Sequence, residues 1–542
     1  MGLGSKIFRA LGILSSEGAG GIRSRLKMLL VTIAERRRYR RWAYLQAQAS
    51  AEHSDAIIRA GREMPRRPLI SVILPVYNIE EELLRKCIDS VRRQTYENWQ
   101  LCIADDFSPS PHVRRVIEEY ASRDSRITAV FRKENGHISA ASNSALEPVK
   151  GEFTALLDHD DELSPDALFW VAREIAASPD ADLFYSDEDK IGPDGDRFDP
   201  AFKPDWSRDL FYSLNLLTHL SVFRTDILRQ IGGFRRGFEG SQDYDLSLRF
   251  IERIDERKIR HIPRVLYHWR VIPGSVAMAA GEKPYAHENA RRALRSHFDR
   301  LGIAAEVTET VNSLHRVRYQ IPASSRIRII VFGEGNWPDS ITSQSTGGLQ
   351  TEFIRCKGYF WEPENINDLR RHDIYCFVNA GLRPANAQWL KELAGFAAVE
   401  QIGCVGGKVL GASGETLAGG IVFAQGRAAT AHYGFPSNAN GNIFRNKVIS
   451  NFSAVAAAVF AIRGDLLRDS GLPDLSDIFG ISEMCLRLRD NGFRIVHTPY
   501  AAFIAGRSFR RSVKAMIPFR NVDDPFLNPN LDIAGGSLLP DA

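Results

Sequence analysis

An apolar segment in the first half of the chain ends abruptly in acidic residues. Residues 155–157 are apolar, and Asp158, Asp160 and Asp161 follow them. An apolar strand that delivers carboxylates at its end supplies the oxygen ligands that Mg²⁺ and Mn²⁺ prefer, and it leaves positions open for phosphate. The same residues would also suit an acidic turn before a helix that begins near Pro165, so the surrounding elements must decide between the two interpretations.

The surrounding residues predict the sheet that would position these carboxylates. Apolar runs typical of buried strands cover 69–75, 100–106, 127–131 and 153–157, and helical patterns such as 80–94 separate them. Apolar strands that alternate with amphipathic helices indicate a doubly wound, Rossmann-like α/β domain with a mostly parallel sheet. In such sheets, ligands bind beyond the carboxyl ends of the strands.

Polar residues stand at three of the predicted strand ends. Tyr77 and Asn78 follow the first strand, Asp105 and Asp106 close the second, and Asp158 follows the fourth. Because the carboxyl ends of parallel strands lie at one edge of a sheet, we expect these groups to face one crevice. Tyr77 taken by itself is equally typical of an aromatic residue that only ends a strand.

The composition is that of a soluble globular protein. The 542 residues suffice for two or three domains, and 44% hydrophobic and 25% charged residues are ordinary values. A net charge of +4 gives no reason to expect a nucleic-acid partner. No apolar run approaches the roughly 20 residues of a membrane-spanning helix, and the six cysteines are scattered without metal-ligand spacing. We therefore expect a cytoplasmic protein.

Changes in pattern divide the chain into four segments. We expect a basic helical arm at 1–68, a first α/β domain at 69–320, a second one at 326–506 and an irregular tail at 507–542. The arm is rich in arginine. It would suit either a surface helix attracted to an anionic membrane or a solvated segment that packs on the next domain.

The second half of the chain echoes the first. Segment 374–381 resembles 153–161, and segment 483–489 resembles 242–249. Two such echoes in the same order indicate an internal duplication of one domain.

Several motifs of the first half resemble those of inverting family 2 glycosyltransferases of the GT-A fold. Leu-Pro-Val-Tyr-Asn at 74–78, Ala-Asp-Asp at 104–106 and Leu-Asp-His-Asp-Asp-Glu at 157–162 carry this resemblance. Further motifs are similar to the branch that assembles bacterial O-antigen and other surface polysaccharides. They lie at 185–190, 202–206, 240–246 and 266–270, so the resemblance covers residues 69 to about 310 in order.

The resemblance implies a nucleotide-sugar donor whose diphosphate is held by a divalent metal, Mn²⁺ or Mg²⁺. The family's metal-binding carboxylates correspond to Asp158 and Asp160. His268 would complete metal or diphosphate binding, or, as a single histidine after an apolar strand, have a structural role. The physical reason is that negative charge grows on the leaving nucleoside diphosphate, and a metal neutralises it as a Lewis acid. The residues that would contact the donor are Pro75, Tyr77, Asp105, Asp106, Asp158, Lys190 and Arg270.

The resemblance also places a catalytic base at Asp243. A carboxylate suits this role because it needs only to take the proton of the acceptor hydroxyl as the new bond forms. Gln242 stands where many members of the family have glutamate, and Asp245 is an alternative base or a packing residue. The remaining predicted contacts to donor or acceptor sugar are Asp187, Glu188, Trp206 and Gln242; for Trp206 a core position is the alternative.

The second half lacks the acidic groups that the chemistry needs. Where the first half has Asp158 and Asp160, the repeat has Asn379 and Gly381, and Glu483 alone remains at the base motif. A domain can keep its fold after it loses its site. We expect a degenerate GT-A-like domain that serves as a non-catalytic partner, with a metal-independent second transferase as the alternative.

Three functions are compatible with these residues. The leading one is a glycosyltransferase, peripheral at the inner face of the membrane, that extends a growing or lipid-linked polysaccharide from a UDP-, dTDP- or GDP-linked sugar. A nucleotidyltransferase would need a glycine-rich phosphate loop after the first strand, and residues 75–78 do not supply one. A catalytically inactive glycan-binding scaffold is the third, and the intact acidic residues argue against it.

Overall fold

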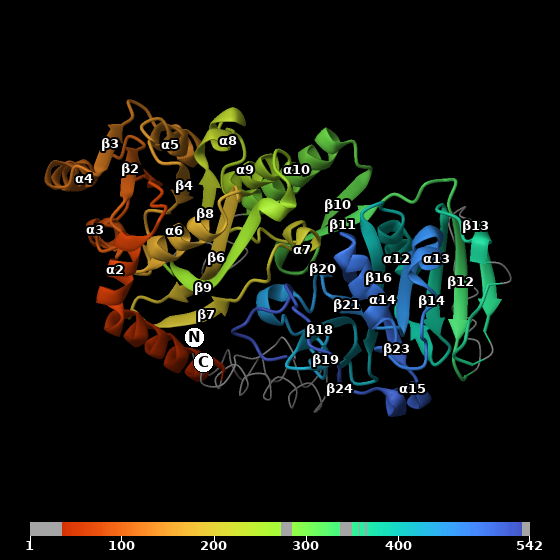
Figure 1. Ribbon diagram of the computed structural model, residues 1–542. Coiled ribbons are helices and arrows are strands. Elements are labelled where there is room, and N and C mark those ends of the chain that lie inside the picture. Colours follow the sequence, from red (N-terminus) through yellow and green to blue (C-terminus); the bar gives the residue numbers. More distant parts are fainter. Residues whose placement is uncertain (1–34, 273–283, 336–349, 357, 364–365, 534–542) are drawn as a thin grey trace, which may run out of the picture.

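The computed structural model describes residues 35–272, 284–335, 350–356, 358–363 and 366–533 (Figure 1). Within these ranges each half of the chain forms one sheet of nine strands. The strands of the first sheet are β1 (Ile70–Val76), β2 (Trp99–Asp105), β3 (Ile127–Phe131), β4 (Phe153–Leu156), β5 (Glu162–Leu163), β6 (Leu183–Ile191), β7 (Arg197–Ala201), β8 (Ser221–Arg224) and β9 (Ile259–Arg270).

The helices of the first half pack on both faces of this sheet. Alternate residues of β1 point to opposite faces, and they belong to two different apolar clusters. Val72 and Leu74 join the cluster that contains α3, α4 and α6, whereas Ile73 joins the one that contains α5, α9 and α10. The helices are α2 (Ser54–Glu63), α3 (Glu81–Arg92), α4 (Pro111–Arg123), α5 (His137–Leu146), α6 (Ala167–Ala177), α7 (Arg208–Phe211), α8 (Thr225–Gln230), α9 (Gln242–Ile251) and α10 (Pro284–Leu301).

The predicted α/β architecture of the first half is confirmed. The four predicted strands are β1 to β4, and each lies within one residue of its expected bounds. These strands pair in parallel in the order β3-β2-β1-β4. The sheet then continues through β8, which is antiparallel to both β4 and β6, so the sheet as a whole is mixed.

The sheet of the second half repeats that of the first from β2 to β5, whereas β3 has no counterpart among its described strands. The first sheet has the order β3-β2-β1-β4-β8-β6-β9-β5, and the second has β13-β12-β14-β22-β16-β23-β15. Each neighbouring pair in the second sheet has the same relative direction as its counterpart, beginning with the parallel pairs of β12 and the antiparallel pair β14–β22. The strands are β12 (Arg326–Phe332), β13 (Gln350–Arg355), β14 (Asp373–Asn379), β15 (Leu382–Pro384), β16 (Ile402–Leu410), β17 (Thr416–Ala418), β20 (Ser450–Asn451), β22 (Val459–Arg463) and β23 (Arg494–Ala505).

Helices recur at the same places in the two halves. A short helix follows β8 and β22, and a longer helix then precedes β9 and β23. In the second half these are α13 (Gly464–Ser470) and α14 (Ser482–Asp490), and α12 (Trp389–Ala397) corresponds to α6. The structure therefore agrees with the internal duplication that the sequence indicated.

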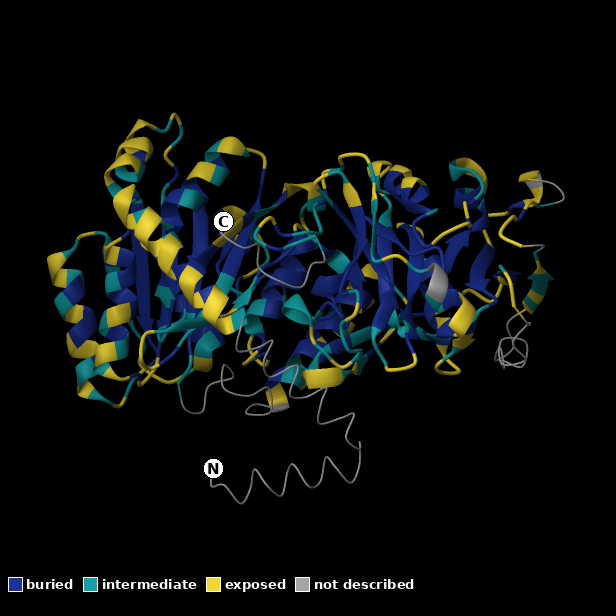
Figure 2. Cartoon of the chain, turned by 90° about the horizontal axis from the view of Figure 1, so that it is seen from below, coloured by how far each residue is buried: buried dark blue, intermediate teal, exposed yellow. Residues whose placement is uncertain are grey.

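The two halves share one apolar core. The hairpin of β10 (Ala305–Glu309) and β11 (His315–Tyr319) leads from one sheet to the other, and one buried cluster continues across both halves. Polar groups fix the contact: Asp209 accepts bonds of 2.7 Å from both Arg494 and Asn451. Figure 2 shows the buried sheets in dark blue, with the exposed faces of the helices in yellow.

Both ends of the described chain pack on the first half. Residues 35–52 form a helix, here called the arm helix; residues 1–34 of the predicted arm lie outside the described range. Tyr39 and Trp42 of the arm helix meet Leu531 in a cluster with Phe202 and Val265. In the described chain, none of the helices combines the length and apolar character needed to cross a bilayer.

The segment after residue 506, expected to be irregular, contains regular elements. Helix α15 (Arg507–Ser512) is followed by β24 (Met516–Pro518). Strand β24 pairs with β19 (Arg427–Thr430) in a small sheet that also contains β18 (Gly420–Ala424) and β21 (Ala454–Val455). Pairing with a partner distant in sequence gives this short segment its strand, which a local pattern does not reveal. The four-segment division of the chain stays a prediction.

Candidate functional site

The pairing of β4 with β8 positions the first acidic residue of the site. The two strands are antiparallel, with Phe153 opposite Arg224 and Ala155 opposite Val222. Each step toward the carboxyl end of β4 is a step toward the amino end of β8, so the same register continued three residues further brings Asp158 opposite His219. The Nε2 atom of His219 lies 3.7 Å from Oδ2 of Asp158.

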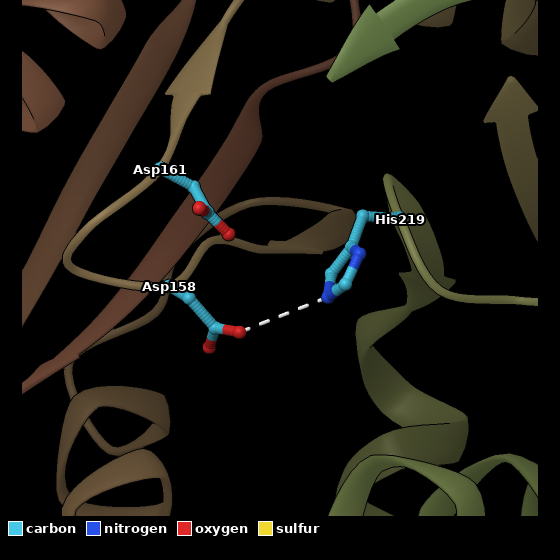
Figure 3. Close-up of side chains that lie close together, drawn as sticks. All are labelled: Asp158, Asp161 and His219. Atoms are coloured by element: carbon cyan, nitrogen blue, oxygen red, sulfur yellow. Dashed lines mark ion pairs between the residues drawn. The ribbon is translucent and has the colours of Figure 1, made fainter. Parts of the chain in front are cut away.

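Three side chains converge at this point. Asp158, Asp161 and His219 each direct a ligand atom to a common region, with these atoms all within 4.8 Å of one another (Figure 3). Asp158 follows β4, Asp161 precedes β5 and His219 precedes β8. Two carboxylates and an imidazole form a donor set that can hold a divalent cation, and the carboxylate oxygens are the ligands that Mn²⁺ and Mg²⁺ prefer.

Asp161 is held in place from behind. Its Oδ2 accepts a bond of 2.5 Å from the Tyr267 hydroxyl, and its Oδ1 accepts one of 2.7 Å from the backbone N–H of Arg270. The guanidinium of Arg270 donates to the backbone carbonyl of Asp160 at 3.0 Å and also contacts Glu162. Strand β9 thus fixes the loop that carries the three aspartates.

Glu188 holds His219 through Nδ1, the ring nitrogen that does not face Asp158. Nδ1 lies 2.8 Å from Oε2 of Glu188, which also accepts a bond from the backbone N–H of His219. The imidazole stacks on the Tyr267 ring with centroids 4.5 Å apart and an interplanar angle of 16°. One nitrogen of the ring is therefore occupied, and the other faces Asp158.

Burial and the interaction of their charges shift the pKa values of the residues in this group. Burial, together with the charges of Asp160 and Asp158, raises the pKa of Asp161 well above its usual value. Burial also raises the pKa of Asp160. For His219, burial by itself would lower the pKa, but Glu188 and Asp158 raise it well above the ordinary value. Crowded carboxylates that are costly to ionise are a fitting place for a divalent ion, whose charge would offset theirs.

Asp243 faces the same region from the first turn of α9. Its Oδ2 accepts a bond of 2.8 Å from Nδ2 of Asn215. Burial raises the pKa of Asp243; the charge of His219 acts to lower this pKa and that of Asp158 to raise it. A carboxylate in this position can take a proton from a ligand held at the acidic loop.

The two neighbours of Asp243 in the base motif have different contacts. Asp245 is buried, and Arg249 and Arg235 donate to its Oδ2 at 2.9 Å and 3.0 Å, so it is held within the helix packing. Gln242 accepts a bond of 2.8 Å from the backbone N–H of Gly240 through its Oε1.

The predicted nucleotide contacts lie at the ends of β1 and β2. Tyr77 is 46% exposed just beyond β1, whereas Pro75 is buried and its carbonyl lies 3.1 Å from Nδ1 of His159. Asp105 accepts a bond from the Ser108 N–H at 3.1 Å. Asp106 is almost fully buried and pairs with Arg132 at 2.7 Å.

Four other predicted site residues contact residues outside the group of Asp158, Asp161 and His219. The Nδ1 atom of His268 lies 2.6 Å from Asp189, and Lys190 pairs with Asp199 at 2.7 Å. Asp187 is buried and accepts bonds from the backbone N–H of Lys203 and from Asn528. Trp206 packs on Phe211 at the edge of the core. The roles expected of these four residues stay predictions.

Sequence reasoning did not identify His219 or Tyr267 as parts of this group. His219 lies 61 positions beyond Asp158, in a stretch with no spacing typical of a metal ligand. The signal that could have found it is the antiparallel register of β4 and β8, and a pattern that predicts only parallel strands does not contain that register.

The second half lacks this group position by position. Asn379 occupies the place of Asp158, and its backbone N–H donates to the carbonyl of Ala458, which occupies the place of His219. Phe503, opposite Pro384, stands where Tyr267 stands opposite Leu163. Glu483, the remaining acid of the base motif, pairs with Arg520 at 2.9 Å.

Three comparisons describe what the chain is similar to. Residues 71–231 match the family model described as Glycosyl transferase family 2. The chain is 36% identical over 547 residues to the uncharacterized protein y4gI of Sinorhizobium fredii, covering 90% of this chain and 60% of that protein. It is 30% identical over 522 residues to the O-antigen biosynthesis protein RfbC of Myxococcus xanthus, covering 87% of this chain and 41% of that protein.

The crystal structure of S. aureus TarS 1–349 in complex with UDP-GlcNAc is 19% identical, with a TM-score of 0.33 over 42% of this chain and 72% of that chain. The chain spans about half the length of the two relatives named above. The match of residues 71–231 to the family model, together with the mixed sheet and the helices on both of its faces, indicates that the first half contains an α/β domain similar to glycosyl transferase family 2.

A buried lysine gives the second half a measurable signature. Lys408 occupies the place of Asp187, and its Nζ donates to the carbonyl and Oδ1 of Asn446, both at 2.7 Å. Burial lowers the pKa of Lys408 to about 7, from the ordinary value of 10.5. Between these two values the unfolded chain holds a proton that the folded protein lacks, so folding stability rises with pH in this window.

We predict that replacing Lys408 with Met removes this pH dependence. The free energy of unfolding of the wild type, measured with urea at pH 7, 8 and 9, should gain up to about 1.4 kcal/mol per pH unit over that of the variant. Parallel pH profiles for the two proteins would contradict the assignment.

Proposed function

We propose that the first half is an inverting, metal-dependent glycosyltransferase that moves a sugar from a nucleotide-sugar donor to a growing or lipid-linked bacterial surface polysaccharide. The observation that carries the proposal is the group of Asp158, Asp161 and His219, together with the half-buried Asp243, within a domain that matches family 2. The name of the Myxococcus relative, an O-antigen biosynthesis protein, supports a polysaccharide acceptor.

Each acidic residue has a separate role in the proposed reaction. The carboxylates of Asp158 and Asp161, with the adjacent Asp160, would hold the metal, and the metal would neutralise the charge that grows on the leaving diphosphate. Asp243 would take the proton of the acceptor hydroxyl at its carboxylate, and the bond from Asn215 orients that carboxylate. Burial, which raises the pKa of Asp243, makes it a stronger base than an exposed aspartate. A single displacement without a covalent enzyme intermediate inverts the sugar configuration.

The donor would lie along the strand ends. Tyr77, exposed beyond β1, would stack its ring on the nucleobase of the donor. Asp105 and Pro75 lie at the adjoining strand ends. We infer a UDP-, dTDP- or GDP-linked sugar. The second half would act as a non-catalytic partner, because none of its described residues at the corresponding positions 379, 381 and 458 is acidic or histidine.

We further propose that the arm helix contacts an anionic membrane at the inner face of the cell membrane. Arg37, Arg41, Tyr44 and Leu45 are exposed and recur at helical spacing, so they share one face. Cations beside exposed aromatic and aliphatic groups suit a lipid surface with negative headgroups.

We predict metal-dependent stabilisation of the protein by one class of nucleotide. Thermal unfolding would be measured with UDP, dTDP, GDP and CMP, each with and without Mn²⁺. A ligand at about 100 times its dissociation constant adds about 2.7 kcal/mol to the folded state. The Asp158→Asn/Asp160→Asn variant should lose the Mn²⁺-dependent part. Absence of stabilisation by every nucleotide would favour the inactive glycan-binding scaffold.

Replacing Asp243 with Asn should greatly slow sugar transfer without weakening donor binding. We expect a loss of about 10²- to 10⁴-fold in transfer rate, because the general base is missing. Nucleotide stabilisation in the presence of Mn²⁺ should equal that of the wild type. A variant that transfers sugar at the wild-type rate would rule out Asp243 as the base.

The membrane contact can be tested by sedimentation with phosphatidylglycerol vesicles. Each arginine near an anionic surface contributes about 1 kcal/mol, so Arg37→Glu/Arg41→Glu should weaken partitioning by about tenfold or more. The control Arg93→Glu/Arg427→Glu makes the same charge change at exposed positions outside the arm helix. Equal sedimentation of the two variants would contradict a specific contact through the arm helix.

A further inference from the structure

We propose that His219 is a ligand of the divalent metal in the site described above, and that Glu188 is the positioning residue that orients it. This inference rests on the proposed function, since it deepens the assignment of the same site. It replaces His268, which the resemblance implied, with a histidine that only the fold brings to the acidic loop.

The geometry of the imidazole leaves one nitrogen directed at Asp158. Nδ1 is engaged by Glu188 at 2.8 Å, and Nε2 lies 3.7 Å from Asp158 Oδ2. That distance is too long for a hydrogen bond. Two atoms that each lie about 2.1 Å from one Mg²⁺ or Mn²⁺ ion are at most about 4.2 Å apart, so 3.7 Å fits two ligands of a shared cation.

The contact with Glu188 is the kind of support that metal-binding histidines have. A ligand histidine usually donates its second ring N–H to a carboxylate, which fixes the tautomer and the direction of the ring. Here Glu188 accepts from both Nδ1 and the backbone N–H of His219, and the ring stacks on Tyr267. Lys203 adds a bond of 2.9 Å to the backbone carbonyl of His219.

The second half of the chain supplies an internal comparison. It keeps the antiparallel pairing of β14 with β22, but Ala458 replaces His219 and Asn379 replaces Asp158. Val409 stands opposite Phe503, as Glu188 stands opposite Tyr267. Because the same strands form without them, the fold does not need Glu188 and His219. Their absence coincides with the absence of the acidic ligands, which indicates that they serve the same site.

His268 has a different environment. Its Nδ1 pairs with Asp189, which also accepts bonds of 2.6 Å from Tyr39 of the arm helix and from Arg197. In this network His268 links β9 to β6 and, through Asp189, to the arm helix. These contacts assign His268 to holding the chain together behind the site.

The test measures Mn²⁺ binding to the full chain by electron paramagnetic resonance, with and without UDP. We expect His219→Ala to weaken Mn²⁺ binding by 10-fold or more, and Glu188→Gln to weaken it by about 10- to 100-fold. The spin-echo signal of a nitrogen bound to Mn²⁺ should be present in the wild type and absent in His219→Ala. His268→Gln, the matched control, should keep both the affinity and the nitrogen signal.

The outcomes separate this inference from the proposed function. If the wild type binds Mn²⁺ and His219→Ala binds it equally well with the nitrogen signal retained, the ligand assignment is overturned and the proposed function stands. If the wild type binds no Mn²⁺ under either condition, the metal site and the metal-dependent function both fail. Thermal unfolding without metal checks that the variants fold. Glu188→Gln, which preserves the shape of the side chain, provides the test should His219→Ala not fold.

Discussion

The antiparallel pairing of β4 with β8 is the constraint on which the site depends. Two parallel neighbours place their carboxyl ends at the same edge of the sheet, as β1 and β2 do with Tyr77 and Asp105. The antiparallel neighbour instead brings the beginning of β8 to the end of β4, so a histidine 61 positions away meets the first aspartate. The site thus combines groups from strand ends with one from a strand beginning.

Strand β6 connects this site to the rest of the molecule through three consecutive acids. Asp187 accepts bonds from Asn528 near the end of the described chain, Glu188 holds His219, and Asp189 accepts a bond from Tyr39 of the arm helix. All three are buried or nearly so, and a buried carboxylate is stable only when its oxygens are bonded. Residues near both ends of the described range therefore bond to the strand that holds His219.

The two halves show how far a fold and a site are independent. Strand order, strand direction and the helices after β8 and β22 agree between them. The polar groups at corresponding positions do not: Asp158, Glu188 and His219 become Asn379, Val409 and Ala458. Apolar strand patterns suffice for the sheet, because burial of apolar surface stabilises it whichever residues end the strands.

The sequence by itself determined the first four strands of the first half, the helices between them and the acidic loop, and it predicted the internal duplication. These follow from local periodicity and residue type: the run 127–131, for example, became β3 without change. The sequence also marked Asp158, because a carboxylate at the end of an apolar strand is visible locally, whereas Asp243 came only from the resemblance to family 2 glycosyltransferases. Only the tertiary structure decided which histidine meets Asp158, and that the C-terminal segment pairs and packs against both halves. Those contacts join residues far apart in sequence, and their register depends on strand direction, which local patterns do not encode.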